Sequence, residues 1–351
     1  MMDMNHVCTI VPPYLLQRLA QAPERPGAWT SVPVSASAAN TLEHDTDLRR
    51  QRRASLPKVA TRTAGLTRAV SDARSSRTLP GRLVRAEGAP ASGDAAADEA
   101  YDGLGATYAL YDQAYQRSSL DGAGLRLDAT VHYGQQYDNA FWDGQRMVFG
   151  DGDGEVFTRF TVSVSVIGHE LAHGVTQFTA GLTYSGQSGA LNESMSDVFG
   201  VLVEQHAATQ SADQASWLVG EGLFLPAVQG RALRDMAAPG TAYDDDVLGK
   251  DPQPATMAGY VQTTEDNGGV HLNSGIPNHA FHLAAVALGG YAWERAGQVW
   301  FDVLTGGTLK PDVDFAGFAA ATVAAAGRRY GGGSDVQTAV RTAWSDVGVE
   351  G

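Results

Sequence analysis

Apolar residues recur at helical spacing through the middle of this 351-residue chain. One such set predicts a helix over about 162–180 and consists of Val162, Val166, Ile167, Val175 and Phe178. Similar patterns predict further helices over 191–207, 278–288, 315–326 and 336–344. The second half of the chain is therefore predicted to be mainly helical.

A different pattern marks residues 139–149, where short apolar runs flank Asp143-Gly144. An Asp-Gly pair between apolar runs is a strong signal for a two-residue turn, so this segment predicts a β-hairpin. An exposed edge strand of such a hairpin can bind an extended peptide by adding it as a further strand. A structural hairpin without a ligand fits the same residues equally well.

Candidate chemistry lies inside the predicted central helix, at His169-Glu170-Leu171-Ala172-His173. Two histidines four residues apart lie on one face of a helix, where both imidazoles can bind one tetrahedral zinc ion. Glu170 follows the first histidine and is suited to accept a proton from water that the metal activates. A buried helix with two hydrogen-bonded histidines is the alternative.

The second part of this pattern is Asn192-Glu193-Ser194-Met195-Ser196-Asp197. A catalytic zinc ion has three protein ligands and an open fourth position, and Glu193 is the candidate for the third ligand. Asp197 lies four residues later on the same helical face. It can accept a hydrogen bond from the other ring nitrogen of His169 and so fix the tautomer. Two solvated carboxylates on a surface helix are the alternative.

With these motifs and further segments, the chain resembles the thermolysin family of zinc endopeptidases, and within it the protealysin-like branch. The similarity runs from about residue 79 to 347, and the segments that carry it are 139–142, 168–174, 189–193, 233–236 and 266–275. The resemblance implies an α+β fold of two domains, one β-rich and N-terminal, the other mainly helical and C-terminal, with the active-site cleft between them. It also implies one catalytic zinc ion, bound by His169, His173 and Glu193, with Glu170 as the general base.

The resemblance assigns catalytic roles at other positions. Tyr184 and His271 match the residues that stabilise the tetrahedral oxyanion, and Asp266 matches the carboxylate that orients the histidine. The chemistry agrees, because a phenol and an imidazolium are suitable donors to a developing negative charge. A neighbouring carboxylate also favours the protonated form of the imidazole.

Substrate-binding positions follow from the same resemblance. Arg234 matches the arginine that holds the substrate carbonyl beside the cleaved bond, and Asn139 with the backbone of Ala140 matches the edge that pairs with extended substrate. The pocket after the cleaved bond falls on five apolar positions, Phe157, Phe160, Val166, Val219 and Leu233. This lining predicts a preference for bulky apolar residues on the leaving side, and the same residues also suit a plain core.

Charge and hydropathy argue against nucleic acid as a partner and against a membrane span, and the resemblance implies peptide and protein substrates. The chain has a net charge of −14, which argues against nucleic-acid binding. No apolar run reaches the length of a membrane span. The first 90 residues carry 13 basic against 7 acidic residues, as expected of an N-terminal arm that folds back onto an acidic body. A solvated tail would have the same charge.

The N-terminus lacks the features of a secretory signal, because Pro12-Pro13 interrupts its apolar stretch and no basic start precedes it. Residues 11–16, Val-Pro-Pro-Tyr-Leu-Leu, instead resemble the short propeptide motif of protealysin-like precursors. Residues 1–55 are therefore expected to be a removable propeptide that inhibits its own enzyme. A flexible linker is expected over 56–77, with exposed, cuttable arginine pairs before it at 49–50 and 52–53. The peptidase domains are expected at 78–183, including the zinc helix, and at 184–351.

Two further metal questions concern Cys8 and calcium. Cys8 is the only cysteine, so no intramolecular disulfide can form. Its thiolate is a candidate for the open zinc position in the precursor, with an incidental thiol as the alternative. Calcium is doubtful, because the positions that match the family's calcium cluster are only partly acidic: Ser165, Glu204, Ser216, Leu218 and Glu221.

Together these features predict a zinc endopeptidase made as an inactive precursor. Secretion is expected from the resemblance alone, and a cytoplasmic location or export without a signal peptide stays open. Two other functions also stay open, namely a zinc aminopeptidase and a zinc- or partner-binding protein without activity. A substrate with a blocked N-terminus separates the two enzymes, since an endopeptidase still cuts it.

Overall fold

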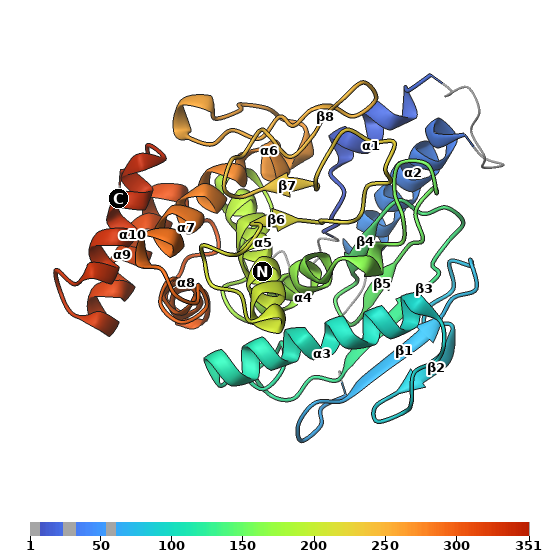
Figure 1. Ribbon diagram of the computed structural model, residues 1–351, viewed down its shortest axis with the longest axis horizontal. Helices are drawn as coiled ribbons and strands as arrows, with labels where there is room; N and C mark the ends of the chain where they lie inside the picture. The colour runs from blue at the N-terminus through green and yellow to red at the C-terminus, as the bar shows by residue number, and fades with distance from the viewer. Residues whose placement is uncertain (1–7, 24–32, 54–60, 351) are drawn as a thin grey trace.

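The computed structural model describes residues 8–23, 33–53 and 61–350. A five-stranded mixed sheet lies toward one end of the molecule, and the last helices form the other end (Figure 1). The strand order is β2-β1-β3-β5-β4, with bounds Arg68–Asp72 for β1, Arg82–Ala86 for β2, Leu127–Val131 for β3, Ala140–Trp142 for β4 and Met147–Phe149 for β5. Strand β4 therefore lies at an edge of the sheet.

Three long helices lie between the sheet and the C-terminal part: α3 (Ala95–Tyr115), α4 (Val164–Phe178) and α5 (Gly186–Ala208). Helix α3 lies along the sheet, and α4 packs against α5 in the centre (Figure 1). Two glycines allow this close packing. A Cβ atom on Gly200 would lie 2.5 Å from the carbonyl oxygen of Ser165, and one on Gly168 would lie 3.0 Å from the Cα atom of Gly200. The approach of the two helices brings the His-Glu motif next to Glu193.

The C-terminal part is helical and is built around aromatic side chains. Its helices are α6 (Asp266–Asn273), α7 (Gly275–Leu288), α8 (Ala296–Thr305), α9 (Phe315–Tyr330) and α10 (Asp335–Asp346). Trp300 stacks on Trp344 and contacts Phe281 and Phe318, so α7 to α10 share one core. Two short ladders connect α5 to α6: β6 (Leu218–Val219) with β7 (Arg234–Asp235), and β8 (Asp244–Asp245) with β9 (Gly249–Lys250). Single 3₁₀ turns occur at Phe160–Val162 and Met257–Gly259.

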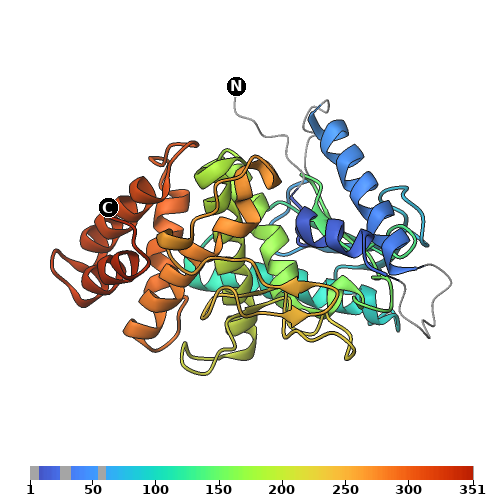
Figure 2. The same cartoon turned by 90° about the horizontal axis from the view of Figure 1, so that it is seen from above.

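The N-terminal segment forms α1 (Pro13–Ala20) and α2 (Val34–Arg53), which lie beside β4 (Figure 2). Leu15, Leu16 and Leu19 are the buried face of α1 and belong to the main hydrophobic core. Pro13 is suited to the first position of this helix, because proline has no N–H to leave unpaired there. The segment is thus packed onto the body as an integral part of the fold.

Several predictions from the sequence are confirmed. The central helix, the four later helices and the hairpin 139–149 all form at their predicted places. The hairpin loop is longer than the predicted two-residue turn, because Trp142 pairs with Met147 and the loop spans 143–146. The Asp143 carboxylate accepts the backbone N–H groups of Gln145 and Arg146 and stabilises this longer loop.

Two other predictions are corrected. The flexible linker expected over 56–77 is wrong at its C-terminal end, because β1 begins at Arg68 and pairs in parallel with β3 through its buried Val70. The arginine pairs at 49–50 and 52–53, which were expected to mark a linker, lie in helix α2. Residues 54–60 lie outside the described residues. No helix in the described part of the chain is both long and apolar enough to cross a membrane.

Candidate active site

The side chains of α4 and α5 converge at one point. His169 Nε2 and His173 Nε2 lie 3.1 Å apart. In the Glu193 carboxylate, Oε2 lies 3.6 Å from His169 Nε2 and Oε1 lies 3.6 Å from His173 Nε2. Ligands at 2.0–2.1 Å from a tetrahedral zinc ion lie about 3.3 Å from one another. The three side chains therefore have the spacing of one zinc site.

The protonation states and hydrogen bonds of these side chains are also those expected of a site that binds a metal cation. Burial lowers the pKa of His173 to about 3, which keeps its imidazole neutral and able to bind a metal. The Oε2 atom of Glu193 is buried and accepts no hydrogen bond from any residue that the structure describes. A buried carboxylate oxygen without a donor is costly, and a metal ion would satisfy it.

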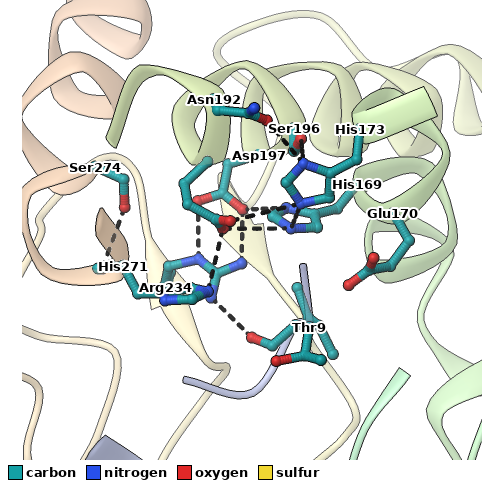
Figure 3. A network of polar contacts seen from close by, with 12 residues as sticks. Thr9, His169, Glu170, His173, Asn192, Ser196, Asp197, Arg234, His271 and Ser274 are labelled. Atoms are coloured by element: carbon teal, nitrogen blue, oxygen red, sulfur yellow. Dashed lines mark hydrogen bonds and ion pairs between the residues drawn. The ribbon is translucent and has the colours of Figure 1, made fainter. Parts of the chain in front are cut away.

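The outer nitrogens of both histidines are held by hydrogen bonds (Figure 3). His169 Nδ1 lies 2.7 Å from Asp197, and His173 Nδ1 lies 2.9 Å from the Asn192 side-chain oxygen and 3.0 Å from the Ser196 hydroxyl. These contacts direct both Nε2 atoms toward the metal position. The sequence prediction for Asp197 is consistent with this contact, whereas Asn192 and Ser196 were not assigned a role.

Asp197 is the centre of a buried cluster. Its carboxylate accepts two hydrogen bonds from Arg234, at 2.7 and 2.8 Å, and one from Asn278 at 2.8 Å. Burial alone would raise the pKa of Asp197, but Arg234 and His169 outweigh it and hold the pKa well below its ordinary value. Asp197 is therefore a fixed negative charge behind His169.

Glu170 faces the same point from the side of β4. It is fully buried, and its Oε2 atom accepts the backbone N–H of Trp142 at 3.0 Å. Its Oε1 atom has no hydrogen-bond donor among the described residues. Burial and the nearby Glu193 raise the pKa of Glu170 well above its ordinary value. A carboxylate of this kind accepts a proton readily near neutral pH.

Tyr184 and His271 lie on the opposite side. The Tyr184 hydroxyl donates a hydrogen bond to Glu193 and lies 3.3 Å from His271 Nε2. His271 Nδ1 lies 2.7 Å from the Asp266 carboxylate, whose second oxygen accepts the His271 backbone N–H at 2.8 Å. Burial lowers the pKa of His271, but Asp266 and Glu193 outweigh it, so the pKa is raised.

The loop before His271 has an unusual backbone that brings its carboxylate partner into place. Asp266, Asn267, Gly268 and Gly269 all have positive φ, between 50° and 90°. Glycine adopts these angles without strain, which explains the Gly-Gly pair. The Asp-Asn-Gly-Gly sequence is therefore the local signal for the contact between Asp266 and His271.

The edge that the resemblance assigns to substrate is occupied by the chain's own N-terminal segment. Thr9 pairs with Phe141 in antiparallel fashion, and Ile10 N–H donates to the carbonyl oxygen of Ala140 at 3.2 Å. The Asn139 side chain accepts the Val11 N–H at 2.9 Å and donates to the Val11 carbonyl at 3.3 Å.

Arg234 completes this contact, since it donates to the Ile10 carbonyl at 3.2 Å. The family resemblance predicts substrate-binding roles for Asn139, Ala140 and Arg234, but it does not identify residues 9–11 as the segment that binds there. The Pro-Pro motif directly after them was the available signal.

The five predicted pocket residues are all buried in the main core: Phe157, Phe160, Val166, Val219 and Leu233. The rings of Phe157 and Phe160 lie 5.5 Å apart, and Leu233 N–H donates to the Val219 carbonyl. Ile10 and Val11 of the N-terminal segment belong to the same core cluster.

This geometry is that of a zinc hydrolase with a helix-borne histidine pair, and comparison with known proteins agrees. The profile of the thermolysin metallopeptidase catalytic domain matches residues 46–177, and that of its α-helical domain matches residues 180–349. The extracellular metalloprotease of Pectobacterium carotovorum subsp. carotovorum is 49% identical over 99% of this chain and 98% of its own length. Thermolysin of Alicyclobacillus acidocaldarius is 41% identical over 79% of this chain and 50% of its own length.

A solved structure is also similar, that of the precursor of protealysin, a metalloproteinase from Serratia proteamaculans. It has a TM-score of 0.88 and 52% identity, and the match covers 97% of this chain and 99% of that one. The chain belongs to the thermolysin family of metallopeptidases. It is a zinc metalloendopeptidase made as a precursor, with the two-domain fold that the sequence predicted.

Proposed function

We propose that this chain cleaves internal peptide bonds with one zinc ion held by His169, His173 and Glu193. The observation that carries the proposal is the convergence of these side chains beside the buried Glu170. The two Nε2 atoms lie 3.1 Å apart, and a Glu193 carboxylate oxygen lies 3.6 Å from each of them. A zinc ion held there would acidify water and polarise the substrate carbonyl.

The residues around this point can carry out proton transfer and stabilise the oxyanion. Glu170 accepts a proton from the attacking water and passes it to the leaving amine. Tyr184 and His271 donate hydrogen bonds to the carbonyl oxygen as it gains negative charge. Asp266 favours the imidazolium form of His271, and Asp197 keeps His169 in the metal-binding tautomer.

The N-terminal segment is proposed to inhibit the enzyme by binding as a substrate would. Its residues Ile10 and Val11 use the hydrogen-bonding groups of Asn139, Ala140 and Arg234 that the family resemblance assigns to substrate. In α2, Ser37 donates to Asp138 at 2.6 Å. Asp45 accepts hydrogen bonds from Tyr137 and Asn139 and so strengthens the same contact. Segment 1–55 is the proposed propeptide. The peptidase domains are proposed at 78–183 and 184–351, and the first of them is extended toward its N-terminus to include the strand at 68–72.

An endopeptidase is favoured over an aminopeptidase by the way the chain crosses the site. Seven residues precede Cys8, so the edge strand binds an internal segment of polypeptide rather than a chain terminus. A site that binds internal segments has no need of a free α-amino group. The completeness of the base and the oxyanion donors argues against a protein that only binds zinc.

A preference for bulky apolar residues on the leaving side is the proposed specificity. The Ile10 N–H donates to the Ala140 carbonyl, and the Ile10 carbonyl accepts a hydrogen bond from Arg234. Ile10 is fully buried and belongs to the main core cluster, which also contains Phe160, Val166 and Leu233. A substrate residue at the place of Ile10 would gain up to about 3 kcal/mol from burial of a leucine-sized side chain. Cleavage of a mixed peptide library by processed enzyme tests this, and a majority of cuts before charged residues would overturn it.

Calcium is proposed to be dispensable. Where the family's calcium ligands are expected, Ser165 contacts the Ser163 hydroxyl at 3.0 Å and the Gly220 N–H at 3.2 Å. Burial raises the pKa of Glu204, which disfavours the anionic form that calcium needs. A calcium-specific chelator should leave the melting temperature unchanged.

Secretion is the proposed localisation, because relatives from Pectobacterium and Serratia are named extracellular proteases.

The test of the proposed endopeptidase activity uses processed protein with casein and with a peptide acylated at its N-terminus. Cleavage of both, lost with a zinc chelator and restored by zinc, is expected. Failure on the blocked peptide alone would favour an aminopeptidase.

A further inference from the structure

The N-terminal segment enters the active site in an extended form that resembles a cleavable peptide. Thr9 pairs with Phe141, and both backbone groups of Ile10 are held, one by Ala140 and the other by Arg234. The Thr9–Ile10 bond therefore lies on the substrate edge, beside the proposed zinc ligands. This arrangement raises the question of what protects the bond from the enzyme's own chemistry.

Cys8 lies at the metal end of this segment. Its sulfur atom and the ligand atoms of His173 and Glu193 all lie within 4.8 Å of one another. Its side chain is 7% exposed, in a small cluster with Tyr184 and Val270. The sulfur therefore lies close to two of the three proposed zinc ligands.

The chemistry of this group suits a fourth zinc ligand. Structural zinc sites are closed by four protein ligands, often with cysteine at about 2.3 Å, whereas catalytic sites keep one position for water. Sulfur and nitrogen ligands of one tetrahedral zinc lie about 3.5 Å apart, so the Cys8 sulfur and the protein ligands would move closer together when they bind the ion. The buried Glu193 Oε2, which has no hydrogen-bond donor among the described residues, independently marks the same point as a cation site.

We propose that Cys8 is the fourth zinc ligand of the uncleaved precursor and that its thiolate keeps the Thr9–Ile10 bond intact. The thiol would bind as a thiolate after releasing its proton to solvent, and it would take the position that the attacking water needs. The closed site has no nucleophile, although the peptide is correctly held. Removal of the N-terminal segment withdraws the sulfur and reopens the position for water.

This inference rests on the proposed zinc site, and a test by metal spectroscopy separates the two. The precursor is prepared with Glu170→Gln to prevent processing, and its zinc environment is measured by X-ray absorption. One sulfur at about 2.3 Å is expected. Cys8→Ser should retain zinc and lose the sulfur signal. Ser37→Ala, which removes hydrogen bonds to Asp138 and Gln136 in the same segment, should retain both.

Thiol labelling gives a second readout, because any alkylation reports on Cys8 alone. The zinc-loaded precursor should react with iodoacetamide at least about tenfold more slowly than the zinc-free precursor, since a coordinated thiolate is not available as a nucleophile. Protection by burial alone would be equal in both forms. Bound zinc without a sulfur ligand, together with equal labelling rates, would overturn the inference and leave the proposed function intact. Absence of bound zinc would overturn both.

Discussion

Substitution of Asp197 by asparagine is the most informative perturbation of the site, because one carboxylate stabilises both the fold and the metal ligands. Asp197 accepts hydrogen bonds from Arg234 and Asn278 and contacts His169 Nδ1. Asparagine has the same shape, but it removes the negative charge. Arg234, which is 1% exposed, would then be a buried cation without its partner.

The loss of folding stability in Asp197→Asn can be worked out from the burial of this ion pair. Removal of one partner of a buried ion pair costs about 3–5 kcal/mol. For a chain of 351 residues with an unfolding entropy of about 2.1 cal/mol/K per residue, this lowers Tm by about 4–7 °C. Loss of a carboxylate behind a metal-bound histidine further weakens zinc binding by about 10- to 100-fold.

Calorimetry of the zinc-free precursor isolates the loss of stability, because no metal ion contributes to its Tm. A matched control is Asp302→Asn. Asp302 also forms a two-hydrogen-bond pair with an arginine, Arg329, at 2.6 and 2.7 Å, but this pair is partly exposed. An exposed pair contributes about 0–1 kcal/mol, so the control should lower Tm by less than about 1.5 °C. An equal Tm for the two variants would refute the reasoning.

Further predictions concern the base, the oxyanion donor and the N-terminal segment. Glu170→Ala should bind zinc stoichiometrically, with kcat about 100- to 10,000-fold lower; robust casein cleavage by it would exclude Glu170 as base. Because Asp266 raises the pKa of His271, activity should persist with rising pH until that pKa is passed, and Asp266→Asn should shift the alkaline limb of kcat/KM to lower pH. An unchanged limb would contradict the role of the imidazolium. Burial lowers the pKa of His44 to about 4, so docking of the segment should be fully stable above pH 6.5 and weaken as pH falls toward 4. Limited proteolysis of an inactive precursor should show this pH dependence, and His44→Gln should reduce it.

The central helix and the convergence of the proposed zinc ligands were predictable because their signals are local. Two histidines four residues apart and a carboxylate on the next helix need only helical geometry to share a face. The approach of α4 to α5, which brings Glu193 to the histidines, depends on Gly168 and Gly200. Their role in that packing becomes visible only when both helices are placed.

Other parts of the fold were missed for identifiable reasons. Helix α3 has a buried face at helical spacing, which includes Ala97, Ala100, Tyr101 and Leu104, and an Asp94 N-cap. Its two glycines and small residues hid this pattern. The sequence predicts a linker at β1 because three of its five side chains are polar, and only pairing with β2 and β3 makes this segment a strand.

The position of residues 8–11 could not follow from sequence patterns, because it depends on a long-range pairing. Thr9 and Phe141 are far apart along the chain, and no local signal links them. The apolar pocket residues pose a similar limit. Their burial was predictable, but burial alone does not distinguish a substrate pocket from a core.

The most direct test of the central claim is the zinc content and activity of processed enzyme measured side by side for the unsubstituted protein and Glu193→Ala. The account predicts one zinc ion per chain and chelator-sensitive cleavage of an N-terminally blocked peptide for the former, and loss of both for the latter. Full zinc content and unchanged cleavage in Glu193→Ala would contradict a metal centre built on His169, His173 and Glu193.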